Sequence, residues 1–238
     1  MSDDILDKSE FDDEDAGIAH KKGDVTHRKV IPILLRPKVV YPFQTFHLEF
    51  EDEHWKPILD EFHEKKSVIG VMYRNEETED LPPVGRVATS ALIEQIHKTA
   101  NGKYLVKIIP INRFFTNEHL ETKPILWAEV SYYWDHPEDD SIIEPLLKEF
   151  LPILNRMGKV GRSKYLQNMT LEELREDIDM LSFLHFTTHP KLTDEERLVA
   201  LWMYKKSLRL EWSIELLENM INERVEKMAD AHFGAKNN

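Results

Sequence analysis

Histidines with nearby carboxylates are the side chains in this sequence whose types could support metal binding or acid–base catalysis. Of the eleven histidines, His47, His54 and His63 each have a glutamate within two residues. A zinc hydrolase needs a spacing such as HExxH, which places two imidazoles on one helix face, and the sequence lacks this spacing. His185 and His189 bracket a predicted helix end, where capping or loop hydrogen bonds explain them better than a metal. We interpret the first three as solvated helix-face residues and predict no metal site.

The sequence also lacks the motifs of a catalytic nucleophile and of a phosphate-binding loop. Ser213 lies within a predicted helix without a local base, and no serine stands in a GxSxG turn. The absence of cysteine excludes thiolate catalysis, disulfides and cysteine-bound zinc. Segment 158–164 lacks the GxxxxGK[ST] spacing that binds phosphate. Asp139 and Asp140, which are neighbours in the sequence, are explained by a helix start, where acidic residues are favourable. The sequence therefore predicts a protein that is not an enzyme and has no cofactor.

Clustered aromatic residues are the remaining candidates for function. Successive side chains in a strand point to opposite faces, so the aromatic runs around positions 41, 114 and 133 cannot be buried on one face alone. Two interpretations remain open: the C-terminal helices cover the second face, or an apolar groove or strand edge stays exposed for a partner. In the second interpretation the partner-binding residues are Tyr41, Phe43, Phe115 and Trp134.

The charge distribution argues against nucleic acid as a partner, and the lack of a long apolar run argues against a membrane. The net charge is −13, and residues 1–17 hold eight acids and one lysine, so residues 1–27 are predicted to be an acidic disordered tail. Nucleic-acid binding needs a basic surface, and the only basic cluster, within 20–29, is short and lies beside this tail. The chain has neither a membrane-length apolar run nor a secretory signal pattern, and we expect a cytoplasmic protein.

Short β-branched runs dominate residues 28–136, which we predict to be a β-rich domain. Asn101-Gly102 predicts a hairpin turn between two alternating segments. Segment 52–65 differs, because Trp55, Ile58, Leu59 and Phe62 follow a helical spacing behind an Asp N-cap candidate. Three prolines divide segment 29–43, KVIPILLRPKVVYPF, and predict two short strands at 31–35 and 38–41 on the rim of a bent barrel.

Helical patterns follow in residues 137–232, which we predict to be a helical bundle, with 233–238 as a flexible C-terminus. A first helix should end near 157–158. Capping-box candidates at Thr170 and Thr193 open helices expected over 170–185 and 194–204, before a long last helix at 207–230. Trp202 and Trp212 lie on apolar stripes and are expected in the core. Strands followed by helices predict an α+β fold.

Six segments, in this order, resemble the substrate-recognition domain at the amino terminus of the ATP-dependent Lon protease. They are IPILLR (31–36) with VVYP (39–42), VGRVA (84–88), NGKY (101–104), NRF (112–114), AEV (128–130), and SLRLE (207–211) with LLENMI (216–221). The resemblance covers about residues 28–228. It implies a bent antiparallel pseudo-β-barrel of the PUA-like type followed by a C-terminal helical bundle.

The sequence departs from the family at two places and in its extent. Phe43 stands where members often carry Gly or a small polar residue, and segment 112–115 is more aromatic than usual. The ATPase and Ser-Lys peptidase of the full protease are absent from these 238 residues, and we expect a free-standing recognition domain.

The resemblance implies non-catalytic binding of unfolded or hydrophobic polypeptide segments, as an adaptor or regulator of proteolysis. A full-length protease is a further expected partner, and the last helix could serve homo-oligomerisation. The alternative from another class is an RNA- or small-ligand-binding barrel, because PUA-like barrels elsewhere hold RNA. The charge distribution makes nucleic acid the weaker of these alternatives.

Overall fold

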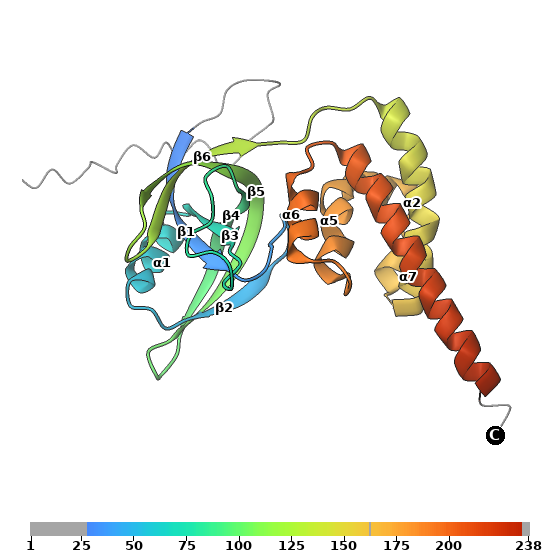
Figure 1. The fold of residues 1–238 in the computed structure, drawn as a ribbon, viewed down its shortest axis with the longest axis horizontal. Coiled ribbons are helices and arrows are strands. Elements are labelled where there is room, and N and C mark those ends of the chain that lie inside the picture. Colours follow the sequence, from blue (N-terminus) through green and yellow to red (C-terminus); the bar gives the residue numbers. More distant parts are fainter. Residues whose placement is uncertain (1–27, 162, 235–238) are drawn as a thin grey trace, which may run out of the picture.

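The computed structural model describes residues 28–161 and 163–234, and it consists of a β-barrel joined to a layer of helices (Figure 1). The strands are β1 (Arg28–Arg36), β2 (Phe46–Phe50), β3 (Val68–Tyr73), β4 (Val87–Lys98), β5 (Tyr104–Glu121) and β6 (Leu126–Tyr133). The helices are α1 (Trp55–Glu64), α2 (Asp140–Gly161), α3 (Lys164–Gln167), α4 (Leu171–Glu176), α5 (Ile178–Thr188), α6 (Asp194–Trp202) and α7 (Lys206–Gly234). The predicted α+β order, with a bent barrel before a helical bundle, is confirmed.

The sheet closes on itself as a partly closed ring. Its strand order is β2-β5-β4-β3-β1-β6, and β6 pairs back onto β5. All pairings are antiparallel except that of β1 with β3. Register shifts in β4–β5 and β5–β6 mark bulges, which bend long strands at barrel corners. The hairpin at Asn101-Gly102 is confirmed, and Gly102 has the positive φ of 81° that such a turn requires.

The proline-rich segment forms one strand, and the expectation of two was wrong. β1 includes Pro32, which pairs with β6 one residue before the pairing with β3 begins at Ile33. Residues 38–41 form no strand. Val39 and Tyr41 are instead buried, and the Val40 carbonyl accepts a hydrogen bond of 2.7 Å from the Thr89 hydroxyl. This side-chain hydrogen bond replaces the backbone hydrogen bonds of a strand pair, so the segment can turn towards the helices.

The helical stripe in α1 is confirmed, whereas its predicted cap is not. Trp55, Leu59 and Phe62 are buried against the barrel strands. Asp52 lies two residues before the N-cap position, His54, and its carboxylate accepts the backbone N–H of His54 at 2.8 Å. An aspartate of this kind closes a turn ahead of the helix and leaves the helix without a side-chain cap.

Both capping boxes in the helical part are confirmed, at Thr170 with Glu173 and at Thr193 with Glu196. The helix expected over 170–185 is divided into α4 and α5 at Asp177. The first helix was expected to end near Gly158, but α2 continues to Gly161. A Cβ atom at position 158 would lie 2.5 Å from the Gln167 backbone nitrogen, so this glycine serves the close approach of α3 and does not end a helix.

A separate apolar cluster joins the barrel to the helices. Val39, Tyr41, Tyr73 and Val87 contribute from the barrel side, and α5, α6 and the loop between them contribute Phe183, Phe186, Leu192, Ala200 and Leu201. The barrel and the bundle each have further clusters of their own. Because α5 and α6 cover this side of the barrel, they determine which candidate residues are buried and which stay exposed.

Candidate functional site

The four predicted partner-binding residues have different surroundings. Tyr41 is fully buried: its hydroxyl donates to the Arg197 carbonyl at 2.8 Å, and its ring stacks on Phe183 at 5.4 Å. Tyr41 therefore cannot contact a partner in this structure, and its inclusion is corrected, because the helices cover this side of the barrel. Phe43 and Trp134 are 48% and 42% exposed, whereas Phe115 is half-buried.

Phe43 occupies a backbone conformation that favours glycine. Its φ is 67°, and it follows Pro42 in a turn that the Gln44 N–H closes onto the Tyr41 carbonyl at 3.4 Å. Proline in the second place and a positive φ in the third are the features of a type II turn, whose third place prefers glycine. The chain thus holds an aromatic side chain about half exposed at a strained position, a combination typical of functional sites.

We expect Phe43→Gly to be more stable than Phe43→Ala by roughly 1 kcal/mol, since a residue with a Cβ atom is disfavoured at this φ. Both variants remove the ring, so their comparison isolates the backbone conformation. Urea denaturation of the two proteins measures the difference. The opposite order, with alanine more stable, would show that the turn relaxes away from the positive φ.

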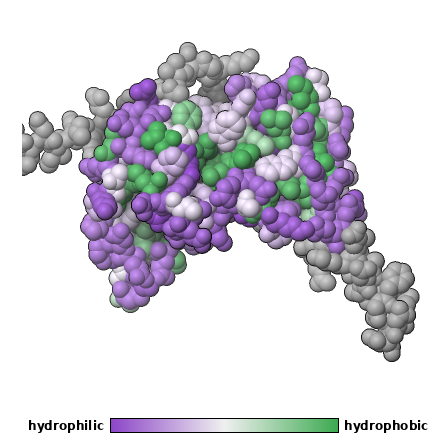
Figure 2. All heavy atoms as spheres, viewed as in Figure 1, coloured by the Kyte–Doolittle hydropathy of each residue, from purple (hydrophilic) through white to green (hydrophobic). Residues whose placement is uncertain are grey.

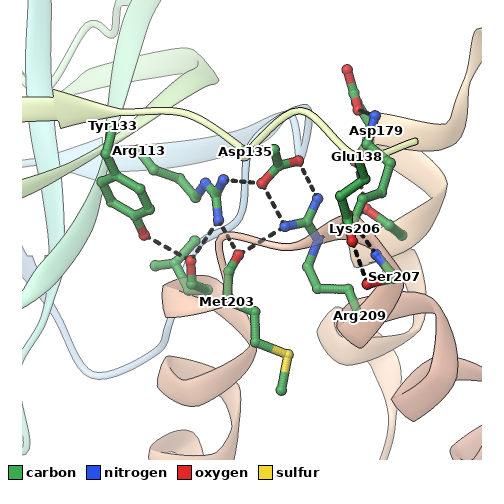
Figure 3. A network of polar contacts seen from close by, with 11 residues as sticks. Arg113, Tyr133, Asp135, Glu138, Asp179, Met203, Lys206, Ser207 and Arg209 are labelled. Carbon is green, nitrogen blue, oxygen red and sulfur yellow. Dashed lines mark hydrogen bonds and ion pairs between the residues drawn. The ribbon is translucent and has the colours of Figure 1, made fainter. Parts of the chain in front are cut away.

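A buried ion cluster fixes the helices to the barrel (Figure 3). Asp135, in the link between β6 and α2, forms ion pairs with both Arg113 of β5 and Arg209 of α7. The two arginine side chains are 5% and 0% exposed. Burial alone would raise the pKa of Asp135, but the hydrogen bonds and charges of the two guanidinium groups outweigh it and lower the pKa.

The same arginines bind the carbonyl groups at the end of α6. Arg113 donates to the Leu201 and Met203 carbonyls at 3.0 and 2.6 Å, and Arg209 donates to that of Met203 at 2.8 Å. The Tyr133 hydroxyl also donates to the Leu201 carbonyl, at 2.8 Å. The last carbonyls of a helix lack partners within the helix and carry partial negative charge, so cations stabilise them. This cluster therefore fixes the position of α6 on the barrel.

Trp202, the last residue of α6, is 59% exposed, which corrects the expectation that it lies in the core. The preceding residues Ala200 and Leu201 face the barrel and are buried, so the next side chain points outward. The Trp202 ring contacts that of Tyr204, whose ring in turn contacts His136 at 4.7 Å. Trp212, the other expected core residue, is half-buried beside the cluster that joins barrel and helices.

A shallow apolar pocket of about 260 Å³ lies beside Trp202, between the start of β4 and α6. It is lined by Gly85, Arg86, Val87, Leu198, Val199 and Trp202. We call these residues the α6 pocket, and we call the exposed residues Trp134, Val199, Trp202 and Tyr204 the junction face. Figure 2 shows apolar residues gathered on the middle of the molecule, where the barrel meets the helices.

The strand register connects Phe115 with this pocket. Phe115 pairs with Val87 across β4 and β5, and directly opposed residues in a sheet share a face. Its ring lies 5.8 Å from that of Tyr133, on the side where the cluster around Asp135 holds α6. The structure thus associates Phe115 with the α6 pocket, whereas no contact joins it to Phe43 among the described residues.

His185 and His189 belong to the helical core. The Nδ1 atom of His189 accepts the Lys191 backbone N–H at 3.3 Å, as expected for a residue at a helix end. His185 is buried between the rings of Phe150 and Phe186, and burial lowers its pKa to about 3. Within 28–161 and 163–234, no three acidic or histidine side chains gather as a metal site would require. No helix in these ranges has the length and apolar character needed to span a membrane.

Sequence reasoning missed the ion cluster and the exposure of Trp202. The signal available was the presence of Arg113 and Arg209 in apolar surroundings, in segments NRFF and SLRLE. Charged residues are rarely buried unless they are paired, so an arginine in a predicted core segment indicates a buried partner. The partner itself, Asp135, has no such local signal.

Comparisons with known proteins agree with this architecture. The N-terminal domain of the Mycobacterium avium complex Lon protease is 19% identical, with a TM-score of 0.60 over 80% of this chain and 98% of the other. A Lon N-terminal domain protein from Xanthomonas campestris is 18% identical, with a TM-score of 0.58 over 79% and 98%. No curated protein matches in sequence.

These structural similarities show the fold, and a family model identifies the family. The model of the ATP-dependent protease La (LON) substrate-binding domain matches residues 30–230, which include most of β1, all of β2 to β6 and most of α7. The match contains both arginines of the ion cluster and the whole α6 pocket. The chain therefore belongs to the family of the LON substrate-binding domain.

Proposed function

We propose that this chain binds unfolded or hydrophobic polypeptide segments without catalysing a reaction on them. The observation that carries the proposal is the exposed apolar surface around Trp202, where a large aromatic side chain borders an open pocket. Exposed aromatic residues next to apolar pockets are typical of protein-binding surfaces. The family description, a substrate-binding domain, supports the same function.

Binding at the junction face would depend mainly on apolar burial. Trp202 and Val199 present 59% and 51% of their surfaces to solvent, and a bound segment would remove much of this surface from water. Such contacts tolerate varied sequences, since apolar burial is not directional. The buried cluster around Asp135 keeps α6 in place, so the surface is formed before a segment arrives.

We further place this activity in the cytoplasm, as an adaptor or regulator of proteolysis that acts with a full-length protease of the family. Self-association through α7 is part of the same proposal. In Figure 1 the C-terminal part of α7 extends beyond the other helices.

Binding to an unfolded polypeptide at different salt concentrations tests the function. We expect the protein to bind a reduced, carboxamidomethylated test protein and not its native form, with an affinity that falls much less steeply with added salt than nucleic-acid binding does. Fluorescence anisotropy of the labelled test protein measures the affinity and its dependence on salt. Single-stranded RNA serves as the second ligand, because phosphate-dependent binding weakens steeply with salt. Salt-sensitive binding of RNA without binding of the unfolded protein would contradict the proposal.

A further inference from the structure

The two segments that supply the lining of the α6 pocket are rich in acidic residues. The segment 74–86, which leads into the pocket, contains Glu76, Glu77, Glu79 and Asp80 against two arginines. The first turn of α6 contains Asp194, Glu195 and Glu196, followed by one arginine. These two segments therefore contain seven carboxylates and three guanidinium groups.

Specific contacts bring these two acidic segments together. Arg86, which lines the pocket, forms an ion pair with Glu79 at 2.5 Å. The Tyr73 hydroxyl donates to Glu195 at 3.5 Å, which joins the barrel side to α6. Burial and then the charges of Glu195, Asp194 and Glu79 raise the pKa of Tyr73, so the carboxylates of both segments act on one site.

Several of these carboxylates are not neutralised by a neighbouring cation. Arg74, Arg86 and Arg197 pair with Glu76, Glu79 and Asp194, respectively. Glu77, Asp80 and Glu195 are exposed and have no cationic partner within 4.0 Å among the described residues. The two segments that supply the lining of the pocket thus keep an excess of negative charge, and we call the three carboxylates without a cationic partner, Glu77, Asp80 and Glu195, the acidic rim.

We propose that the α6 pocket selects polypeptide segments in which an apolar or aromatic residue is flanked by lysine or arginine. The pocket would take the apolar side chain beside Trp202, while the flanking cations pair with the acidic rim. This inference rests on the proposed binding of polypeptides and adds the class of segment. It also predicts rejection of acidic segments, since like charges would face each other at the rim.

Three labelled peptides of one length test this selectivity. Each has a central Leu-Phe-Leu core, flanked on both sides by lysines, by serines or by glutamates. We expect the lysine-flanked peptide to bind about three- to tenfold more tightly than the serine-flanked one, as two exposed ion pairs of ordinary strength imply. The glutamate-flanked peptide should bind most weakly, and the differences should shrink as salt increases.

Charge reversal locates the effect. In Asp80→Lys with Glu195→Lys, the order of the lysine- and glutamate-flanked peptides should invert, while the serine-flanked peptide binds as before. The matched control, Glu64→Lys with Glu149→Lys, makes the same charge change at exposed positions on α1 and α2 and should keep the original order. Circular dichroism verifies that both variants fold.

The outcomes separate the inference from the proposed function. Equal binding of all three peptides to the unmodified protein would overturn the selectivity and leave polypeptide binding intact. An unchanged order in the rim variant, or an inverted order in the control, would also overturn it. If none of the peptides binds and the unfolded test protein does not bind either, the proposed function itself fails.

Discussion

Replacing Asp135 with asparagine is expected to lower the free energy of unfolding by about 3–5 kcal/mol, the range for removal of one partner from a buried ion pair. The carboxylate pairs with Arg113 and Arg209 at once, and both arginine side chains are almost completely buried. The variant leaves two guanidinium charges in the interior without a counter-charge. Equilibrium urea denaturation at neutral pH measures the loss.

Asp179→Asn is the matched control for this variant. It removes the ion pair between Asp179 and Lys206. The Asp179 carboxylate in this pair is 61% exposed. Exposed pairs contribute about 0–1 kcal/mol because water solvates both charges well. Equal losses in the two variants would contradict a special role for Asp135.

The contribution of Asp135 should also depend on pH. Its pKa is lowered in the folded protein, so the carboxylate stabilises the fold fully above its unfolded pKa of about 3.9. The stabilisation is lost as pH falls through the lower pKa of the folded state. The difference in stability between the unmodified protein and Asp135→Asn should therefore narrow below about pH 4. A difference that stays constant to lower pH would show that the charge of Asp135 is not the cause.

Local patterns allowed much of the fold to be predicted. Thr170 and Thr193 were recognisable as caps because the reciprocal hydrogen bonds of each capping box join residues only three positions apart. The hairpin at Gly102 likewise depends on a few neighbouring residues. The helical stripe of α1 follows from its spacing alone. In each case the interaction that decides the structure lies within one or two turns of the chain.

The junction between barrel and helices could not be predicted in this way. Tyr41 is buried because Phe183 and the Arg197 carbonyl, more than 140 positions away, cover it. Trp202 lies on an apolar stripe but faces solvent, because Arg113 of β5 fixes the end of α6 in one orientation. Periodicity gives the apolar side of a helix, whereas the position of its neighbours decides which residues remain exposed. The candidate site depends on such contacts, so its main residue was missed.

The position of Trp202 makes it the residue whose loss should affect binding most. We expect Trp202→Ser to weaken binding of the unfolded test protein by about 30-fold, the effect of losing an aromatic residue central to an interface. The indole is 59% exposed and lies at the last position of α6, so its removal leaves the buried core and the helix unchanged. Fluorescence anisotropy with the labelled test protein measures affinity, and thermal denaturation verifies stability.

Tyr165→Ser provides the control for loss of an exposed aromatic residue elsewhere. Tyr165 is 50% exposed on α3, in the helical part, and it is not among the residues of the junction face or the α6 pocket. Its replacement should leave the affinity within about twofold, as for most residues outside a binding centre. If both variants bind equally well, the junction face is not the binding site. In that case Phe43, an exposed aromatic residue with a positive φ, becomes the next position to replace.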